Sequence, residues 1–165
     1  MLRPQTKDLY TPQQLEQYMQ QALQAAQQAE IEGEVPIGAV IVDNLTNQVI
    51  AQGYNQRETR QDPLAHAEIE AITAACQKVG SWRLEHHSLF VTLEPCAMCA
   101  GAIINSRITN VIFGACDPKA GSVESLIHLF DFPYNSRPDY QSGVLAPECS
   151  QTLTTFFRKI RQQNS

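Results

Sequence analysis

The chain has 165 residues, of which 43% are hydrophobic and 18% charged, and its formal net charge is −5. This length and composition predict a single folded domain over residues 1–165 and exclude an intrinsically disordered chain. The acidic charge argues against a broad nucleic-acid-binding face. A small RNA element can still be gripped by a local cluster of cations, and Phe156-Phe157-Arg158-Lys159-Ile160-Arg161 offers one.

Neither a signal peptide nor a membrane span is expected. The N-terminal sequence has no apolar stretch typical of a signal, and no apolar run approaches the roughly 20 residues that cross a bilayer. The five cysteines are odd in number and only one pair is closely spaced, which argues against a secreted disulfide framework. We therefore expect a soluble, cytoplasmic protein with no membrane partner, whose thiols are reduced or bind metal.

The first half of the chain predicts one helix followed by a hairpin. Thr11-Pro12 is a helix start signal, residues 13–31 are rich in helix formers, and Gly33 ends the helix. Residues 36–42 and 48–54 have the β-branched, apolar character of strands, with a short polar turn between them. These two strands are expected to pair as a hairpin.

Alternating strands and helices follow. Asp62-Pro63 predicts the cap and first position of a helix that runs to Val79. Residues 88–93 form a predicted buried strand, residues 95–104 a helix, and residues 111–113 the next strand. Strand, helix and strand in this order imply a parallel crossover.

The last third is less regular. Residues 126–142 contain Pro133, Asn135 and Pro138 and predict a loop-rich excursion. A short strand around residues 143–145 and a terminal helix over residues 147–161 complete the chain. Together the elements predict an α/β fold, a three-layer α/β/α sandwich with a mixed five-stranded central sheet.

Two motifs carry the chemistry: His66-Ala67-Glu68 near one helix start and Pro95-Cys96-Ala97-Met98-Cys99 at another. A helix N-terminus has a positive dipole end, which stabilises thiolates, and thiolates bind metal. Cys96 and Cys99 are three residues apart and fall on the same side of one turn, so both sulfurs can reach one ion. Tetrahedral zinc accepts one nitrogen and two sulfurs, and a catalytic site leaves its fourth position to water.

Zinc lowers the pKa of its water enough to supply hydroxide at neutral pH, while Glu68 is expected to shuttle protons to the leaving amine. The spacing sets a geometric condition. In a helix interior, His66 and Glu68 would point about 200° apart, so both can serve one site only at a helix end. A helix that began well before Asp62 would contradict this interpretation.

His-x-Glu followed by Pro-Cys-x-x-Cys is the signature of zinc nucleobase deaminases. Beyond it, the chain from Tyr18 to Arg161 resembles the bacterial tRNA-specific adenosine deaminase family of the cytidine deaminase-like superfamily. The resemblance rests on residues 34–40, Asn55, residues 62–69, 93–103, 106–108 and 113–121, and Phe156-Phe157-Arg158. It differs at Cys116, where family members carry a basic residue, and over residues 126–142.

The resemblance implies hydrolytic conversion of adenosine to inosine at the wobble position of an arginine tRNA, with one Zn²⁺ per subunit. It implies that Asn55 bonds the flipped adenine, that Asp117 touches the neighbouring sugar, and that Phe157 and the following cations meet the anticodon stem-loop. The resemblance also implies that the walls of the pocket are formed by Val35, Pro36 and Leu93. It implies that Ala67 contacts the substrate as well. The family is homodimeric, so a homodimer is expected.

Three alternatives stay open. The Cys-x-x-Cys pair is also the redox motif of thioredoxin-like proteins, which would leave the His-Ala-Glu motif without a role. A structural zinc module would need a fourth protein ligand, and the candidates are Cys76, Cys116, Cys149, His86, His87 and His128. Within the enzymes, a free-base or nucleoside deaminase acting on guanine, cytosine or cytidine shares the zinc signature. Glu34 and Glu94 are interpreted as structural carboxylates, since carboxylates beside helix starts commonly cap or pair.

Overall fold

A mixed five-stranded sheet forms the centre of the molecule in the computed structural model, which describes residues 5–165; the first four residues of the expected domain lie outside it. The strands lie in the order β2-β1-β3-β4-β5. Strand β1 is antiparallel to β2 and β3, whereas β3, β4 and β5 run parallel. The bounds are β1 Gly38–Asp43, β2 Gln48–Tyr54, β3 His87–Leu93, β4 Asn110–Ala115 and β5 Asp139–Ser142. The predicted hairpin and the parallel crossover are both confirmed.

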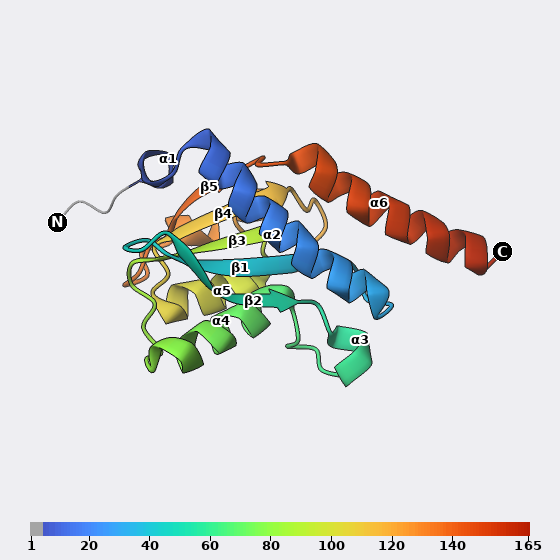
Figure 1. Ribbon diagram of the computed structural model, residues 1–165, viewed down its shortest axis with the longest axis horizontal. Helices are drawn as coiled ribbons and strands as arrows, with labels where there is room; N and C mark the ends of the chain where they lie inside the picture. The colour runs from blue at the N-terminus through green and yellow to red at the C-terminus, as the bar shows by residue number, and fades with distance from the viewer. Residues whose placement is uncertain (1–4) are drawn as a thin grey trace.

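Helices cover both faces of this sheet (Figure 1). Helices α2 and α6 lie on one face, α4 and α5 on the other, and the far end of α6 projects beyond the sheet. The helices are α1 Thr6–Leu9, α2 Pro12–Ile31, α3 Arg57–Arg60, α4 Ala67–Val79, α5 Ala97–Ser106, a 3-10 turn η1 Leu129–Asp131, and α6 Ala146–Gln163. This is the predicted three-layer α/β/α sandwich. Within residues 5–165, no helix combines the length and apolarity needed to cross a membrane.

The sheet is buried on both faces, and its central strands carry unbroken apolar runs in their middle parts, at residues 39–42, 89–91 and 111–113. Val40 and Phe90 are fully buried in the core under α2, while the neighbouring Ile41 and Leu89 are fully buried in the core under α4 and α5. Successive strand residues point to opposite faces, so an unbroken apolar run is what a sheet covered on both sides requires. The two cores hold the carboxyl end of β3 and the starts of α4 and α5 in fixed relation.

Two predicted helix starts are displaced toward the C-terminus. Helix α4 begins at Ala67 rather than at Pro63, and α5 begins at Ala97 rather than at Pro95. Asp62 makes a local turn instead of a helix cap, because its Oδ1 accepts a hydrogen bond from the Leu64 N–H at 2.9 Å. The consequence is that His66 precedes α4 with an extended backbone, at φ −79° and ψ 154°.

The predicted strand over residues 143–145 is wrong. Strand β5 ends at Ser142, and the following Gly143 and Leu145 have φ values of +90° and +52°, which no strand accommodates. The strand itself lies at the end of the segment interpreted as loop-rich, and it pairs in parallel with β4 from Asn110↔Asp139 onward. Its polar sequence gives little strand signal, so the pairing partner determines its structure.

Gly38 allows α2 to pack directly on the first residue of β1. A Cβ at this position would lie 2.1 Å from the carbonyl oxygen of Ala22 and 2.4 Å from the backbone nitrogen of Ala26. We expect Gly38→Ala to lower the free energy of unfolding by about 3 kcal/mol, at the upper end for overpacking, because backbone atoms cannot move aside easily. Urea denaturation checks this. The matched variant Gly101→Ala, whose Cβ meets nothing within 4 Å, should be no less stable than the wild type.

Candidate metal centre and active site

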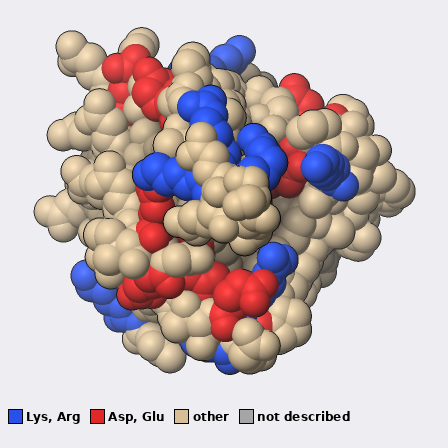
Figure 2. All heavy atoms as spheres, turned by 90° about the vertical axis from the view of Figure 1, so that its right-hand side faces the viewer, with Lys and Arg blue, Asp and Glu red and all other residues tan. Residues whose placement is uncertain are grey.

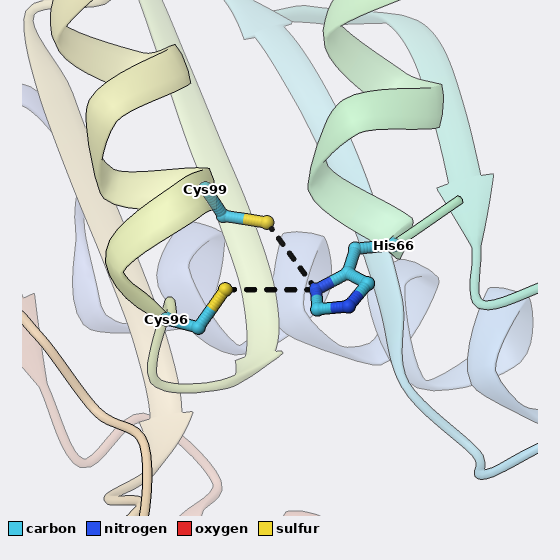
Figure 3. A group of neighbouring side chains, drawn as sticks. All are labelled: His66, Cys96 and Cys99. Carbon is cyan, nitrogen blue, oxygen red and sulfur yellow. Dashed lines mark hydrogen bonds between the residues drawn. The ribbon is translucent and has the colours of Figure 1, made fainter. Parts of the chain in front are cut away.

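Three donor atoms converge where α4 and α5 begin. The Nδ1 atom of His66 lies 3.6 Å from the sulfur of Cys96 and 3.5 Å from that of Cys99. Figure 3 shows the imidazole reaching across from the start of one helix toward both sulfurs at the start of the other. Tetrahedral zinc, with bonds of about 2.05 Å to nitrogen and 2.3 Å to sulfur, places these atoms about 3.6 Å apart. The three residues therefore fit zinc without rearrangement.

Local backbone geometry brings these residues together. His66 is the N-cap of α4 and Cys96 is the N-cap of α5, both in extended conformation, and neither side chain caps its own helix. Both imidazole and thiol are thus free to point across the gap between the helices. In a helix interior, the side chains of residues 66 and 68 would point about 200° apart. Because His66 precedes the helix and Glu68 lies in its first turn, this restriction does not apply to them. The geometric condition set by the sequence is met.

The two thiols differ in acidity. A hydrogen bond from Cys99 lowers the pKa of Cys96 to about 4, with a further lowering contribution from His66. The same shared hydrogen bond, together with burial, raises the pKa of Cys99. Cys96 is therefore the more acidic thiol of the pair, as expected for a sulfur at the positive end of a helix dipole.

No fourth protein ligand joins this cluster in the part of the chain that the structure describes. Among His, Cys, Asp and Glu there, the one group of three or more residues whose donor atoms all lie within 4.8 Å of one another is His66, Cys96 and Cys99. None of the six candidates for a closed structural site belongs to the group. A three-residue set that leaves one tetrahedral position open is the arrangement of catalytic zinc.

Glu68 lies beside the cluster without belonging to it. Its side chain is 4% exposed, in the first turn of α4, and it borders the same cavity as His66 and Cys96. Burial raises the pKa of Glu68 to about 7. A buried carboxyl group with such a pKa can both accept and release a proton near neutral pH, which is the requirement for general acid–base catalysis.

A cavity of about 240 Å³ opens above these groups. Most of the residues predicted for the substrate line it: Val35, Asn55, Ala67, Leu93, Asp117 and Phe157. Pro36 is buried next to Val35 and is not among the lining residues. The structure adds further lining residues that the sequence analysis did not single out for the site: Ile37, Arg57 and Ala120. Ile37 lies directly before β1, whereas Arg57 and Ala120 reach the cavity through the folding of the segments after β2 and β4.

Glu34 and Glu94 organise the loops around the cavity, consistent with a structural role. The carboxylate of Glu34, 1% exposed, accepts hydrogen bonds from the Glu58 and Thr59 N–H groups at 3.1 and 2.7 Å. Burial opposes its ionisation, yet these hydrogen bonds lower the pKa of Glu34 below its usual value. Glu34 thus fixes the short helix α3 that follows Asn55.

Glu94 does the same for the loop after β4. Its carboxylate accepts a hydrogen bond from the hydroxyl of Ser125. It also accepts hydrogen bonds from four backbone N–H groups, those of Asp117, Val123, Glu124 and Ser125. Burial disfavours the charge, but the bonds from Ser125 and the backbone lower the pKa of Glu94. Gly121 packs against this carboxylate so closely that a Cβ there would lie 2.3 Å from it.

We expect Glu94→Gln to lower the free energy of unfolding at pH 7 by about 1–3 kcal/mol, because an amide cannot accept all these bonds. The folded-state pKa of Glu94 lies below its usual 4.5, so its contribution is complete above that value and is lost as pH falls through the folded pKa. The difference between wild type and variant should therefore shrink from pH 7 to pH 4 in urea denaturation. A difference that stays constant or grows would contradict this assignment.

The end of α6 borders the cavity. Phe156 is 7% exposed and packs inward, while its neighbour Phe157 is 43% exposed and lines the cavity. Figure 2 shows the face that contains the projecting end of α6, where basic side chains gather above a group of acidic ones. The basic residues of this helix are Arg158, Lys159 and Arg161. The locally positive surface expected from the sequence exists in spite of the negative net charge.

Comparison with known proteins agrees with this geometry. The family model of the cytidine and deoxycytidylate deaminase zinc-binding region matches residues 12–115. The tRNA-specific adenosine deaminases of Bacillus subtilis and Haemophilus influenzae are each 48% identical over 149 residues, 90% of this chain and 91% and 86% of theirs. A solved structure from a study of A-to-I editing by tRNA:A34 deaminases at the wobble position of transfer RNA is 43% identical, with a TM-score of 0.79 over 83% of this chain and 99% of that one. The chain therefore belongs to the tRNA-specific adenosine deaminase family, among the zinc-binding deaminases of the cytidine and deoxycytidylate type.

Proposed function

We propose that this protein is a zinc-dependent deaminase that converts adenosine to inosine at the wobble position of a tRNA, consuming water and releasing ammonia. The observation that carries the proposal is the buried Glu68 beside a three-donor cluster with zinc spacing, at the base of a cavity. Near-full-length identity of 48% to tRNA-specific adenosine deaminases supports the substrate.

His66, Cys96 and Cys99 would hold one zinc ion per subunit. The ion, when bound, would act as a Lewis acid and make water a nucleophile at neutral pH. The protein's part is to place that chemistry in a cavity whose lining includes the buried residues Asn55, Ala67 and Glu68. It also keeps both sulfurs at one helix start, where the dipole favours thiolates.

Glu68 would move the protons. A carboxylate beside the attacking water accepts its proton, and the resulting acid donates a proton to the ring or to the departing amino group of adenine. Burial isolates this exchange from bulk solvent. Because Glu68 is not among the clustered donors, its role is separate from holding the metal.

The cavity walls would bind a flipped base. The Asn55 side chain is held in place, since its amide nitrogen donates to the Val35 carbonyl at 3.2 Å and its oxygen accepts from the Arg57 N–H at 3.2 Å. We assign it the contact to adenine, with Val35, Ala67 and Leu93 as walls. Asp117 would meet the neighbouring sugar.

The α6 edge would meet the anticodon loop. Exposed Phe157 offers a stacking surface, and the cations beside it offer phosphate contacts. Single-stranded RNA is recognised by such stacking and by contacts to splayed bases. Phe156, packed in the core, serves to hold the helix in place.

One assay separates this function from the free-base alternatives. An anticodon stem-loop with adenosine at the wobble position is incubated with the protein beside free guanine, cytosine and cytidine, and deaminated products are quantified. We expect inosine in the RNA and no turnover of the small molecules. Turnover of a free base with the RNA untouched would refute the tRNA assignment.

We further infer that the protein is a homodimer. The segment around η1 exposes four large apolar side chains by 42–57%, and such exposure favours a protein interface; the residues are Leu126, Ile127, Phe132 and Tyr134. We expect Leu126→Asp to shift the protein from dimer to monomer in sedimentation equilibrium, because it would place a charge in an apolar contact. The matched control is Leu45→Asp in the turn between β1 and β2, where Leu45 is 76% exposed; it should leave the dimer intact. A wild-type monomer would contradict the inference.

We place the protein in the cytoplasm, where tRNA is its substrate. The chain's free cysteines and thiolate-based metal site are suited to a reducing compartment.

A further inference from the structure

Arg57 is a cavity residue that no sequence motif identified. Besides Arg57, the cavity lining contains three carboxylates, those of Glu68, Glu94 and Asp117. Arg57 contributes the one guanidinium or ammonium group among the residues lining this cavity. A cavity with this lining favours a positively charged or neutral ligand. A negatively charged ligand would have to contact the guanidinium of Arg57.

The proposed substrate brings negative charge to this place. An adenosine within RNA carries a phosphate on each side, and both come close to the rim when its base enters the cavity. The carboxylates on the lining and the net charge of −5 oppose their approach. A cation at the cavity would therefore assist the approach of RNA more than that of a free base.

The side chain of Arg57 is loosely held in the free protein. Its Nε lies 3.9 Å from the carboxylate of Glu58, and the two side chains are 51% and 70% exposed, so this ion pair holds the guanidinium weakly. Arg60, on the same short helix, is committed elsewhere, at 2.6 Å from Glu70 and 3.4 Å from Asp62. Of the two arginines of α3, Arg57 alone lines the cavity and lacks a close ion pair.

The backbone of Arg57 is firmly positioned. Its N–H donates to Asn55, the residue assigned to the base, and the next two N–H groups donate to the buried carboxylate of Glu34. The base-binding amide and the guanidinium are thus two residues apart on one anchored turn. In a nucleotide, the base and its adjoining phosphate likewise lie close together, so one turn of the chain could contact both.

Building on the proposed function, we propose that Arg57 binds one of the two phosphates that flank the reacting adenosine. Its planar fork can donate two hydrogen bonds to a phosphate. Arg57 thereby acts as a specificity-determining residue. It favours an adenosine inside an RNA chain over a free base or nucleoside, which brings no phosphodiester.

The test uses Arg57→Gln, which removes the charge and keeps the N–H that Asn55 accepts. On the native stem-loop we expect kcat/KM to fall about tenfold, and the slope of its logarithm against log salt to decrease by about 0.7, as for one lost phosphate contact to a single strand. Lys78→Gln, the same charge change at the exposed far end of α4, should alter neither value. Arg57→Lys should restore the salt slope and part of the rate.

Two further RNAs carry a single neutral methylphosphonate linkage, one 5′ and the other 3′ of the adenosine. We expect wild type to lose about tenfold on one of them and Arg57→Gln to lose nothing more on that same RNA. Equal losses for both proteins at both linkages would overturn the proposal, as would an Arg57→Gln variant as active as Lys78→Gln. Failure of the proposed function is distinct, because wild type would then leave the native stem-loop unchanged.

Discussion

Glu68→Ala is expected to keep its zinc and its fold and to lose activity by on the order of 10³-fold, within the range typical of a lost general acid–base group. The reason is that Glu68 borders the cavity beside the metal donors without being one of them. The measurement pairs zinc content per subunit with single-turnover deamination of the stem-loop. Glu68→Gln keeps the size of the side chain and should be nearly as inactive, because an amide cannot carry the proton.

An exposed carboxylate provides the matched control. Glu85→Ala removes a carboxylate whose side chain is 53% exposed in an ion pair with Arg83, and should leave zinc content and rate unchanged. If Glu68→Ala instead loses its metal, the carboxylate belongs to the ligand set, and the separation of metal binding from proton transfer is wrong. Substantial activity in Glu68→Gln would show that the side chain acts by position rather than by proton transfer.

Cys96→Ala is expected to abolish zinc binding and with it all measurable deamination. One of three donors is lost, and the remaining His66 and Cys99 cannot hold the ion at the concentrations that saturate the wild type. Because metal binding is coupled to folding, the wild type gains stability from zinc, about 2.7 kcal/mol at a hundredfold excess over Kd. The variant should show no zinc-dependent rise in Tm.

Cys116→Ala is the control for thiol loss, because Cys116 is exposed and lies outside the donor cluster. It should bind zinc and respond to it as the wild type does. Zinc retained by Cys96→Ala, with four protein ligands seen by X-ray absorption in the wild type, would instead favour a closed structural site. A zinc-free wild type with a reversible disulfide between Cys96 and Cys99 would favour the redox alternative.

The chemistry of the site was readable from the sequence because its signals are local. His66 and Glu68 lie two residues apart, and Cys96 and Cys99 lie within one helical turn, so each half of the metal site is set by a few consecutive residues. Helix caps and apolar runs likewise depend on near neighbours in the chain. The same locality explains why the sandwich and the hairpin were predicted correctly.

The errors arose where local signals compete. Asp62-Pro63 has the composition of a helix start, yet the Asp62 side chain bonds the Leu64 N–H and makes a turn, which delays α4 to Ala67. Because the later start places His66 outside the helix, its imidazole can reach the sulfurs of Cys96 and Cys99. Polar residues 139–142 become a strand only because the edge of β4 is there to pair with them.

The sequence by itself pointed to the three clustered donors, to the buried carboxyl group beside them and to the layers of the fold, since each signal depends on residues close together in the chain. Only the tertiary structure decided which distant loops meet at the cavity. Glu34 and Glu94 hold those loops through backbone N–H groups more than 20 residues away, and backbone donors leave no mark on side-chain patterns. Arg57 reaches the cavity for this reason, and its place there follows from long-range hydrogen bonds that no motif encodes.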